Sequence, residues 1–260
     1  MTRDLKITIV QTNLIWEDIG ANLANFRKRL EIIEPSATDL IVLPEMFNTG
    51  FTMNASAVAE SMNGKTMEWM AKLSAEKKSV VTGSIVIKED DKFYNRLIWM
   101  RPDSTYEYYN KRHTFRMAKE NETYANGVSK LIVHLHGWKI CPLVCYDLRF
   151  PVWSRNTGDY DLLIYVANWP ERRSYPWRQL LIARAIENQV YVVGVNRIGN
   201  DGNGVEHTGY SAVINPKGEP ISTTQPNVES VETVTLSYTE LEKFKEHFPV
   251  ALDADKFRIE

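Results

Sequence analysis

The chain has 260 residues, of which 43% are hydrophobic, and this is enough to bury a large core in a single domain. Its 31 basic and 33 acidic residues are mixed along the sequence, and the formal net charge is −2. This balance argues against nucleic acid and against an anionic membrane surface as partners.

The start of the chain and its two cysteines predict a cytoplasmic protein. Met1 to Lys6 lead directly into a strand-like segment without the apolar region of a signal peptide, and no apolar run is long enough to span a bilayer. Cys141 and Cys145 are four residues apart, which on one strand corresponds to roughly 13 Å. A disulfide does not bridge that separation, so at least one free thiol is expected.

The first half of the chain alternates predicted strands and helices. Apolar residues recur at steps of four and three from Ile19 to Ile33, which predicts a helix over 18–34. A short apolar strand over 39–44 is followed directly by Glu45. The other predicted elements here are strands over 6–11 and 106–110, strands over 79–87 and 94–100 that form a hairpin, a loop over 46–63 and a helix over 66–77.

The second half begins with a long polar loop over 112–127, and loops of this length inside compact domains are usually functional. A strand over 138–144 ends at Cys145. The tail over 249–260 has no obvious partner in its own chain and is expected to pack against a second subunit. The other predicted elements are strands over 131–135, 161–167, 190–196, 210–215 and 231–236, helices over 176–188 and 239–248, and a glycine-rich connection over 199–209.

The order of these elements predicts the fold class. Strands and helices alternate, with several hairpins inserted, and this favours a layered α/β sandwich over a doubly wound sheet. The sequence contains no internal repeat and no linker, so we expect one domain over residues 1–260.

Three predicted strand ends carry reactive side chains, which are Glu45, Lys111 and Cys145. Neighbouring strands lie about 4.8 Å apart, so we expect these residues to meet at one edge of a sheet. A carboxylate can take the proton of a thiol that attacks a carbonyl carbon, and an ammonium can neutralise the developing oxyanion. With the backbone N–H of Tyr146 as a second oxyanion donor, the set could perform acyl transfer.

Each of these residues, taken alone, also has a structural explanation. A cysteine at the end of an apolar strand is more often a small buried hydrophobe than a nucleophile. A lone glutamate or lysine is usually a solvated surface charge. The joint occurrence of all three, together with their local sequences, favours the catalytic interpretation.

The local sequences are Leu43–Phe47 (LPEMF), Asn110–His113 (NKRH) and Val144–Pro151 (VCYDLRFP). In this order and at these separations, they resemble the signature segments of the nitrilase or carbon–nitrogen hydrolase superfamily. The resemblance covers nearly the whole chain and implies an α-β-β-α sandwich that forms four layers. It also implies that Glu45 is the general base, that Lys111 stabilises the oxyanion and that Cys145 is the nucleophile.

Members of this superfamily often carry a second glutamate in the loop after the lysine, some seven residues before a glycine. Glu120 lies seven residues before Gly127, whereas Glu122 lies five residues before it. Glu120 is therefore the preferred candidate, and Glu122 is the alternative. A second carboxylate would keep Lys111 charged and oriented, and could order the substrate amide.

Within the superfamily, the segments 145–151, 167–170 and 184–189 are most similar to the ω-amidase branch. That resemblance implies hydrolysis of the terminal amide of a 2-oxo dicarboxylic acid monoamide, such as 2-oxoglutaramate or 2-oxosuccinamate. The free carboxylate of such a substrate needs a cation or several N–H donors opposite the reacting amide. The candidate cations are Arg116, Arg149, Arg172 and Arg173.

Two candidate substrate-binding residues keep an alternative role. Arg149 could pair with Asp147 as a structural bridge instead of binding substrate. Trp169 directly follows a predicted strand and could form a wall of the pocket, although tryptophan is more often a core residue.

Other functions stay open from the sequence. Neither a metal nor a cofactor is expected, because the five histidines form no ligand motif, and solvent-facing positions on a strand explain His134 and His136 better than a zinc site. A nitrilase, an N-carbamoyl amidase, an amide-forming acyltransferase and a non-catalytic ligand-binding protein of the same fold are the alternatives. The family resemblance further implies a homodimer that pairs through helices beside the nucleophile strand.

Overall fold

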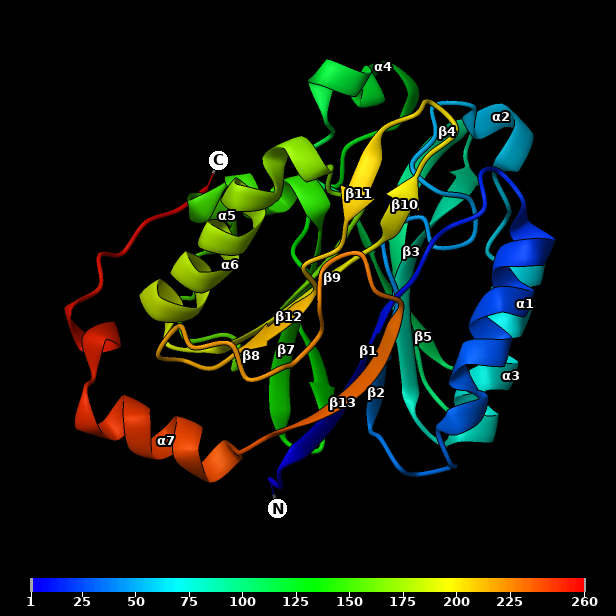
Figure 1. Cartoon of the computed structure of the whole chain (residues 1–260). Coiled ribbons are helices and arrows are strands. Elements are labelled where there is room, and N and C mark those ends of the chain that lie inside the picture. The colour runs from blue at the N-terminus through cyan, green and yellow to red at the C-terminus, as the bar shows by residue number, and fades with distance from the viewer. Residues whose placement is uncertain (1, 260) are drawn as a thin grey trace.

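The computed structural model describes residues 2–259, and two β-sheets face each other at its centre with helices on their outer faces (Figure 1). The first sheet contains, in spatial order, β13 (Ser230–Leu236), β1 (Leu5–Gln11), β2 (Leu40–Val42), β3 (Val80–Glu89), β4 (Lys92–Met100) and β5 (Tyr106–Asn110). β2 is parallel to β3, and β3, β4 and β5 form an antiparallel meander. Consequently β2 and β5 run in the same direction, and both end at the same edge of the sheet.

The second sheet contains, in spatial order, β12 (Ala212–Ile214), β9 (Tyr191–Asn196), β8 (Leu162–Ala167), β7 (Trp138–Val144) and β6 (Val133–Leu135). β7, β8 and β9 are parallel. Every residue of β8 and β9 is buried, as expected for parallel strands that are covered on both faces. The predicted α-β-β-α sandwich is therefore confirmed.

The helices α1 (Ile19–Arg29) and α3 (Lys65–Lys77) cover the outer face of the six-stranded sheet. The side chain of Asp18 caps α1 by accepting a hydrogen bond from the third residue of the helix. α1 ends earlier than the predicted helix over 18–34 and continues as a single 3₁₀ turn. Pro35 prevents a helix that reaches residue 34, because a proline disfavours helical conformation in the residue before it.

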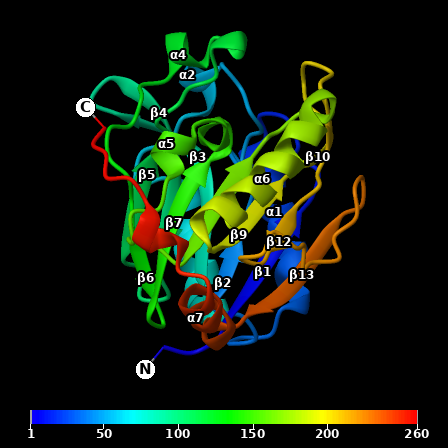
Figure 2. The same cartoon turned by 90° about the vertical axis from the view of Figure 1, so that its left-hand side faces the viewer.

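The outer face of the five-stranded sheet is covered by α6 (Ser174–Asn188), which lies across β9 (Figure 2). A Cβ atom at Gly194 of β9 would lie 2.5 Å from a methyl carbon of Leu181, so a side chain there would push the helix away. The shorter helices α5 (Pro151–Ser154) and α7 (Tyr238–His247) lie on the same side. Within residues 2–259, no helix is long and apolar enough to cross a membrane.

The alternation of side chains along β2 divides the apolar residues between two cores. Leu40 and Val42 belong to the core that includes the second sheet, whereas Ile41 and Leu43 belong to the core under α1 and α3. This one short strand therefore contributes side chains to both cores. This fixes the position at which the chain leaves β2, just before Glu45.

Three segments predicted as loops contain short elements that periodicity cannot detect. The loop 46–63 includes α2 (Ala55–Val58), and the glycine-rich connection forms a hairpin of β10 (Ile198–Asn200) and β11 (Glu206–Thr208). The loop 112–127 includes α4 (Glu120–Thr123) and a preceding 3₁₀ turn. All three lie at one end of the sandwich (Figure 1).

The tail after α7 forms a 3₁₀ turn, Val250–Asp253, and then runs back toward α5 (Figure 2). Part of it lies against its own chain, where Phe257 shares a surface groove with Val152 of α5. Leu252 remains 83% exposed and Phe257 43% exposed. Packing of this tail on a second subunit stays a prediction.

Candidate active site

The three reactive strand ends converge, but from two sheets. Glu45 follows β2 and Lys111 follows β5 in the six-stranded sheet, whereas Cys145 follows β7 in the five-stranded sheet. The expectation that all three share the edge of one sheet is therefore wrong. The alternation of strands and helices along a sequence does not reveal which strands join the same sheet. Here β2 and β5 of one sheet and β7 of the other all end at the same end of the sandwich.

Lys111 is the centre of a buried charge cluster. Its Nζ atom lies 2.8 Å from Oε1 of Glu45 and 2.9 Å from both carboxylate oxygens of Glu120. All three side chains are at most 1% exposed. Burial alone would lower the pKa of Lys111, but the carboxylates of Glu120 and Glu45 outweigh it and hold the pKa above its ordinary value. The lysine is therefore an ammonium at any physiological pH.

The second glutamate of the cluster is Glu120, whereas Glu122 is exposed. Glu120 also accepts a hydrogen bond from the backbone N–H of Phe115, at 2.5 Å. Burial raises the pKa of Glu120, and the charge of Lys111 opposes this rise. The residue before it, Lys119, has a φ of 59°, in the left-handed region, so the loop turns sharply to direct the carboxylate inward.

Two asparagines extend the cluster. The Nδ2 atom of Asn95, on β4, donates to Oε1 of Glu45 at 2.8 Å and to Oε1 of Glu120 at 3.2 Å. The backbone N–H of Asn168, just after β8, donates to the other oxygen of Glu45 at 2.8 Å. Sequence reasoning did not single out Asn95, although a polar residue within an apolar strand is a usable signal.

The thiol of Cys145 faces this cluster. Burial raises its pKa well above the ordinary value, and the negative charge of Glu45 acts in the same direction, against the charge of Lys111. The thiol is thus protonated at neutral pH, and Glu45 is the carboxylate whose charge acts on it most strongly. The backbone of Cys145 has a φ of 43°, which places the residue on a tight turn between β7 and the 3₁₀ turn Cys145–Arg149.

The other cysteine has a different environment. Cys141 is completely buried inside β7, and burial raises its pKa. Both cysteines are free. Cys141 therefore fills space in the core, three residues before the strand ends.

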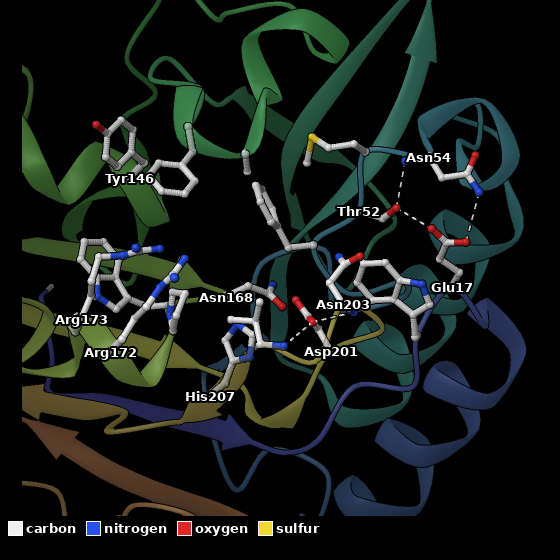
Figure 3. Close-up of a pocket in the computed structure, with 18 of the residues that line it drawn as sticks. Glu17, Thr52, Asn54, Tyr146, Asn168, Arg172, Arg173, Asp201, Asn203 and His207 are labelled. Carbon is white, nitrogen blue, oxygen red and sulfur yellow. Dashed lines mark hydrogen bonds between the residues drawn. The ribbon is translucent and has the colours of Figure 1, made fainter.

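A cavity of about 580 Å³ lies at this end of the molecule, and Figure 3 shows the side chains that line it. Tyr146, Arg149 and Trp169 line it, and their binding of substrate stays a prediction. Arg149 does not pair with Asp147, whose carboxylate is hydrogen-bonded to Tyr109, His113 and Val144. The Arg149 guanidinium instead lies 5.1 Å from the centre of the Trp169 ring. Trp169 itself is 4% exposed, so it belongs to the core and to the cavity wall.

The cavity reaches the charge cluster through two residues. Phe51 lines the cavity, and its ring centre lies 5.2 Å from Nζ of Lys111. Asn168 also lines the cavity and donates to Glu45. Only these two residues therefore separate the cavity from the carboxylate and the ammonium at these points.

Other wall residues come from the connections between the predicted strands and helices. Arg172 and Arg173 line the cavity, whereas Arg116 is exposed and does not. The hairpin of β10 and β11 contributes Asp201 and His207. Glu17, Thr52, Asn54, Phe115 and Asn203 also line the cavity.

His134 and His136 lie at the turn between β6 and β7. His134 is exposed on β6, and Nε2 of His136 lies 3.4 Å from Asp39. Among residues 2–259, no group of three or more histidine, cysteine, aspartate or glutamate side chains could hold a metal ion.

Comparisons with known proteins agree over the whole chain. The model of one family, described as carbon-nitrogen hydrolase, matches residues 6–246. An ω-amidase of Escherichia coli strain K12, YafV, is 47% identical over 255 residues, which cover 98% of both chains. A 2-oxoglutaramate amidase of Bacillus subtilis strain 168 is 31% identical over 245 residues, which cover 91% of this chain and 93% of the relative. A solved structure of a CN-hydrolase superfamily protein from Xanthomonas campestris, with an arsenic adduct in its active site, matches at a TM-score of 0.97 and 41% identity over 100% of both chains.

Proposed function

Because the chain belongs to the carbon–nitrogen hydrolase family and is an amide-hydrolysing enzyme, we propose that its substrate is the terminal amide of a 2-oxo dicarboxylic acid monoamide. The compounds meant are 2-oxoglutaramate and 2-oxosuccinamate. The products are the dicarboxylic acid and ammonia. The similarity to an ω-amidase and to a 2-oxoglutaramate amidase supports this choice of substrate.

The reaction begins at Cys145. Its sulfur attacks the amide carbon while Glu45 takes the thiol proton, and the oxyanion that forms is held by the Lys111 ammonium and the backbone N–H of Tyr146. Glu45 then returns the proton to the amide nitrogen, the C–N bond breaks and ammonia leaves. A water molecule that Glu45 deprotonates cleaves the thioester, which releases the acid and restores the thiol.

Glu120 has a supporting role in this scheme. It contacts Lys111 with both oxygens and so keeps the ammonium charged and fixed, which leaves Glu45 free to exchange a proton. The single observation that carries the proposal is the buried ammonium of Lys111, which is held between the carboxylates of Glu45 and Glu120.

Substitution of the nucleophile tests the chemistry. We expect Cys145→Ala to lower ammonia release from 2-oxoglutaramate by at least about 10⁴-fold, because no other group can form the thioester. Cys141→Ala is the matched control and should keep turnover, since Cys141 lies inside the core. Intact mass spectrometry during turnover should detect an acyl adduct on Cys145. Unchanged turnover in Cys145→Ala would disprove the mechanism.

A substrate panel separates the alternatives that share these residues. Ammonia release is measured with 2-oxoglutaramate, 2-oxosuccinamate, a simple nitrile and an N-carbamoyl amino acid. A preference for either 2-oxo amide supports the proposal. A preference for the nitrile or the carbamoyl compound would identify a nitrilase or an N-carbamoyl amidase instead, and inertness toward all four would favour an acyltransferase or a non-catalytic protein.

We further propose a cytoplasmic homodimer. Two buried free thiols suit a reducing compartment, and exposed apolar side chains on α5 and α6, among them Val152 and Ile186, offer a surface for pairing. Light scattering at micromolar concentration should give twice the chain mass of 30.0 kDa. A monomer would contradict the pairing, and a periplasmic fraction after cell fractionation would contradict the compartment.

A further inference from the structure

Three arginines form one wall of the cavity without any acidic partner. Arg149 ends the 3₁₀ turn that begins at Cys145, and Arg172 and Arg173 lie in the 3₁₀ turn after β8. Within the described part of the chain, none of their guanidinium groups forms an ion pair or a hydrogen bond with another residue. Elsewhere, Arg101 pairs with a glutamate at 2.7 Å.

The arrangement holds the three positive charges close together. The guanidinium of Arg149 is placed by the ring of Trp169, and that of Arg173 lies 5.1 Å from the ring centre of Phe115. Burial lowers the pKa of Arg173, and the charges of Arg172 and Arg149 lower it further. Aromatic rings thus fix cations that repel one another, and a bound anion would relieve this repulsion.

The opposite wall carries the opposite charge. Figure 3 shows Arg172 and Arg173 on one side of the cavity, and Glu17 and Asn54 on the other. Glu17 accepts hydrogen bonds from Thr52 and Asn54, and Asp201 accepts them from backbone N–H groups of its own turn. Neither carboxylate forms an ion pair within residues 2–259. An anion in the cavity is therefore attracted to one wall and repelled by the other.

The spacing along the chain suits a short substrate. Cys145 and Arg149 are four positions apart in a 3₁₀ turn, which rises about 2 Å per residue, so their Cα atoms are about 8 Å apart. The carbon chain between the amide and the carboxylate of 2-oxoglutaramate spans about 5 Å when extended. A carboxylate that hydrogen-bonds a guanidinium adds about 3 Å. The substrate is therefore of about the same length as the turn that carries both residues, which favours one molecule that contacts the sulfur at one end and Arg149 at the other.

We propose that Arg149, Arg172 and Arg173 form an anion subsite that holds the 2-oxo acid end of the substrate. Their N–H donors suffice for both carboxylate oxygens and for the neighbouring keto oxygen. The enzyme then selects amides by a negative charge at the end remote from the scissile bond, while Glu17 and Asp201 prevent the reverse orientation. This inference rests on the proposed function, because it takes acylation of Cys145 as the reaction.

The test compares a charged amide with a neutral one. kcat/KM is measured for 2-oxoglutaramate and for pentanamide, which has the same number of carbon atoms but no carboxylate, in the wild type and in Arg149→Gln, Arg172→Gln and Arg173→Gln. We expect Arg149→Gln and Arg173→Gln each to lower kcat/KM for 2-oxoglutaramate by about 10- to 100-fold, chiefly through KM, with pentanamide changed less than about twofold. The exposed Arg172→Gln should cost less. Arg178→Gln, an arginine of α6 that stacks on Tyr210 outside the cavity, is the matched control and should change neither substrate.

Equal losses for both amides, or no loss for either, would overturn the proposal. A second measurement keeps it testable if 2-oxoglutaramate is not a substrate, which would refute the proposed function alone. Glutarate should slow alkylation of Cys145 by iodoacetamide in the wild type, and this protection should weaken at least about tenfold in Arg173→Gln. Protection that is equal in both proteins would also overturn the anion subsite. If Arg149→Gln does not fold, Arg173→Gln carries both measurements.

Discussion

At the scale of single residues, the charge balance of the buried cluster assigns each group its task. Two carboxylates share one ammonium, so the cluster carries an excess negative charge when the Cys145 thiol is neutral. Asn95 and backbone N–H groups offset this excess with hydrogen bonds to the carboxylates. A further negative charge at the sulfur is costly, and this is why the thiol keeps its proton until a substrate carbonyl can accept the electrons.

The first residue-scale prediction concerns Glu120. Glu120→Gln keeps the shape of the side chain but removes one of the two charges that hold Lys111. We expect kcat for amide hydrolysis to fall by about 10²- to 10³-fold, as when a charge-stabilising group is lost, with the protein still folded. The measurement is steady-state ammonia release together with circular dichroism. The exposed Glu122→Gln is the control, and a loss of the same size there would contradict the selective role of Glu120.

At the scale of elements, Asp147 connects the two sheets beside the cluster. Its carboxylate, which is completely buried, accepts hydrogen bonds from the backbone N–H and Nδ1 of His113, at 3.0 and 2.7 Å. It also accepts from the hydroxyl of Tyr109 on β5 and from the N–H of Val144 on β7, at 2.8 and 3.0 Å. The segment that bears Lys111 is thereby connected to the turn that bears Cys145.

We therefore predict that Asp147 is a positioning residue. In Asp147→Asn, an NH₂ group replaces one carboxylate oxygen and cannot accept the hydrogen bonds that the surrounding donors form with Asp147. This loss should lower the free energy of unfolding by about 2–4 kcal/mol. A shift of about 1 Å between Lys111 and Cys145 should also lower kcat by about 100-fold with little change in KM.

Asp161→Asn is the matched control. Asp161 is buried at the other end of β8, where it accepts from Lys139 and Lys245, so its loss should cost stability and leave kcat unchanged. Parallel changes of kcat in both variants would show that Asp147 acts on stability alone.

The sequence predicts the long elements and three of the site residues, but not the pairing of the strands. The long helices and strands were predicted because each has a face or a run of apolar residues, and Glu45, Lys111 and Cys145 were singled out because each follows such a strand. The sheet that receives β7 was not predictable, because strand pairing depends on contacts between distant residues. The hairpin of β10 and β11, which supplies Asp201 to the cavity, has strands of three residues each and no periodicity to detect.

At the scale of the whole molecule, the cavity is a meeting point of segments from both sheets. Glu17 comes from the turn after β1, Tyr146 and Arg149 from the turn after β7, and Asp201 from the turn after β10. The hairpin of β10 and β11 is held to the loop after β1 by an isolated bridge between Asn13 and the first residue of β10. The shape of the cavity therefore depends on the stability of the whole sandwich.

His207 of β11 makes that stability depend on pH. The side chain is 2% exposed, and burial, with a smaller contribution from the charge of Arg197, lowers its pKa to about 4. The pKa in the unfolded chain is about 6.5, so folding favours the neutral imidazole. The stabilisation is complete above pH 6.5 and is lost as the pH falls toward 4. Between pH 7 and pH 5, this one group should lower the free energy of unfolding by about 2 kcal/mol.

Urea unfolding at both pH values measures this effect. In His207→Gln, which cannot titrate, the difference between pH 7 and pH 5 should shrink by about 2 kcal/mol relative to the wild type. The half-exposed His136 provides the control, since His136→Gln should leave most of that difference in place. An unchanged pH dependence in His207→Gln would mean that the hairpin opens to admit a proton before the molecule unfolds. In that case, hydrogen exchange of β10 and β11 should accelerate at pH 5 while β7, β8 and β9 remain protected.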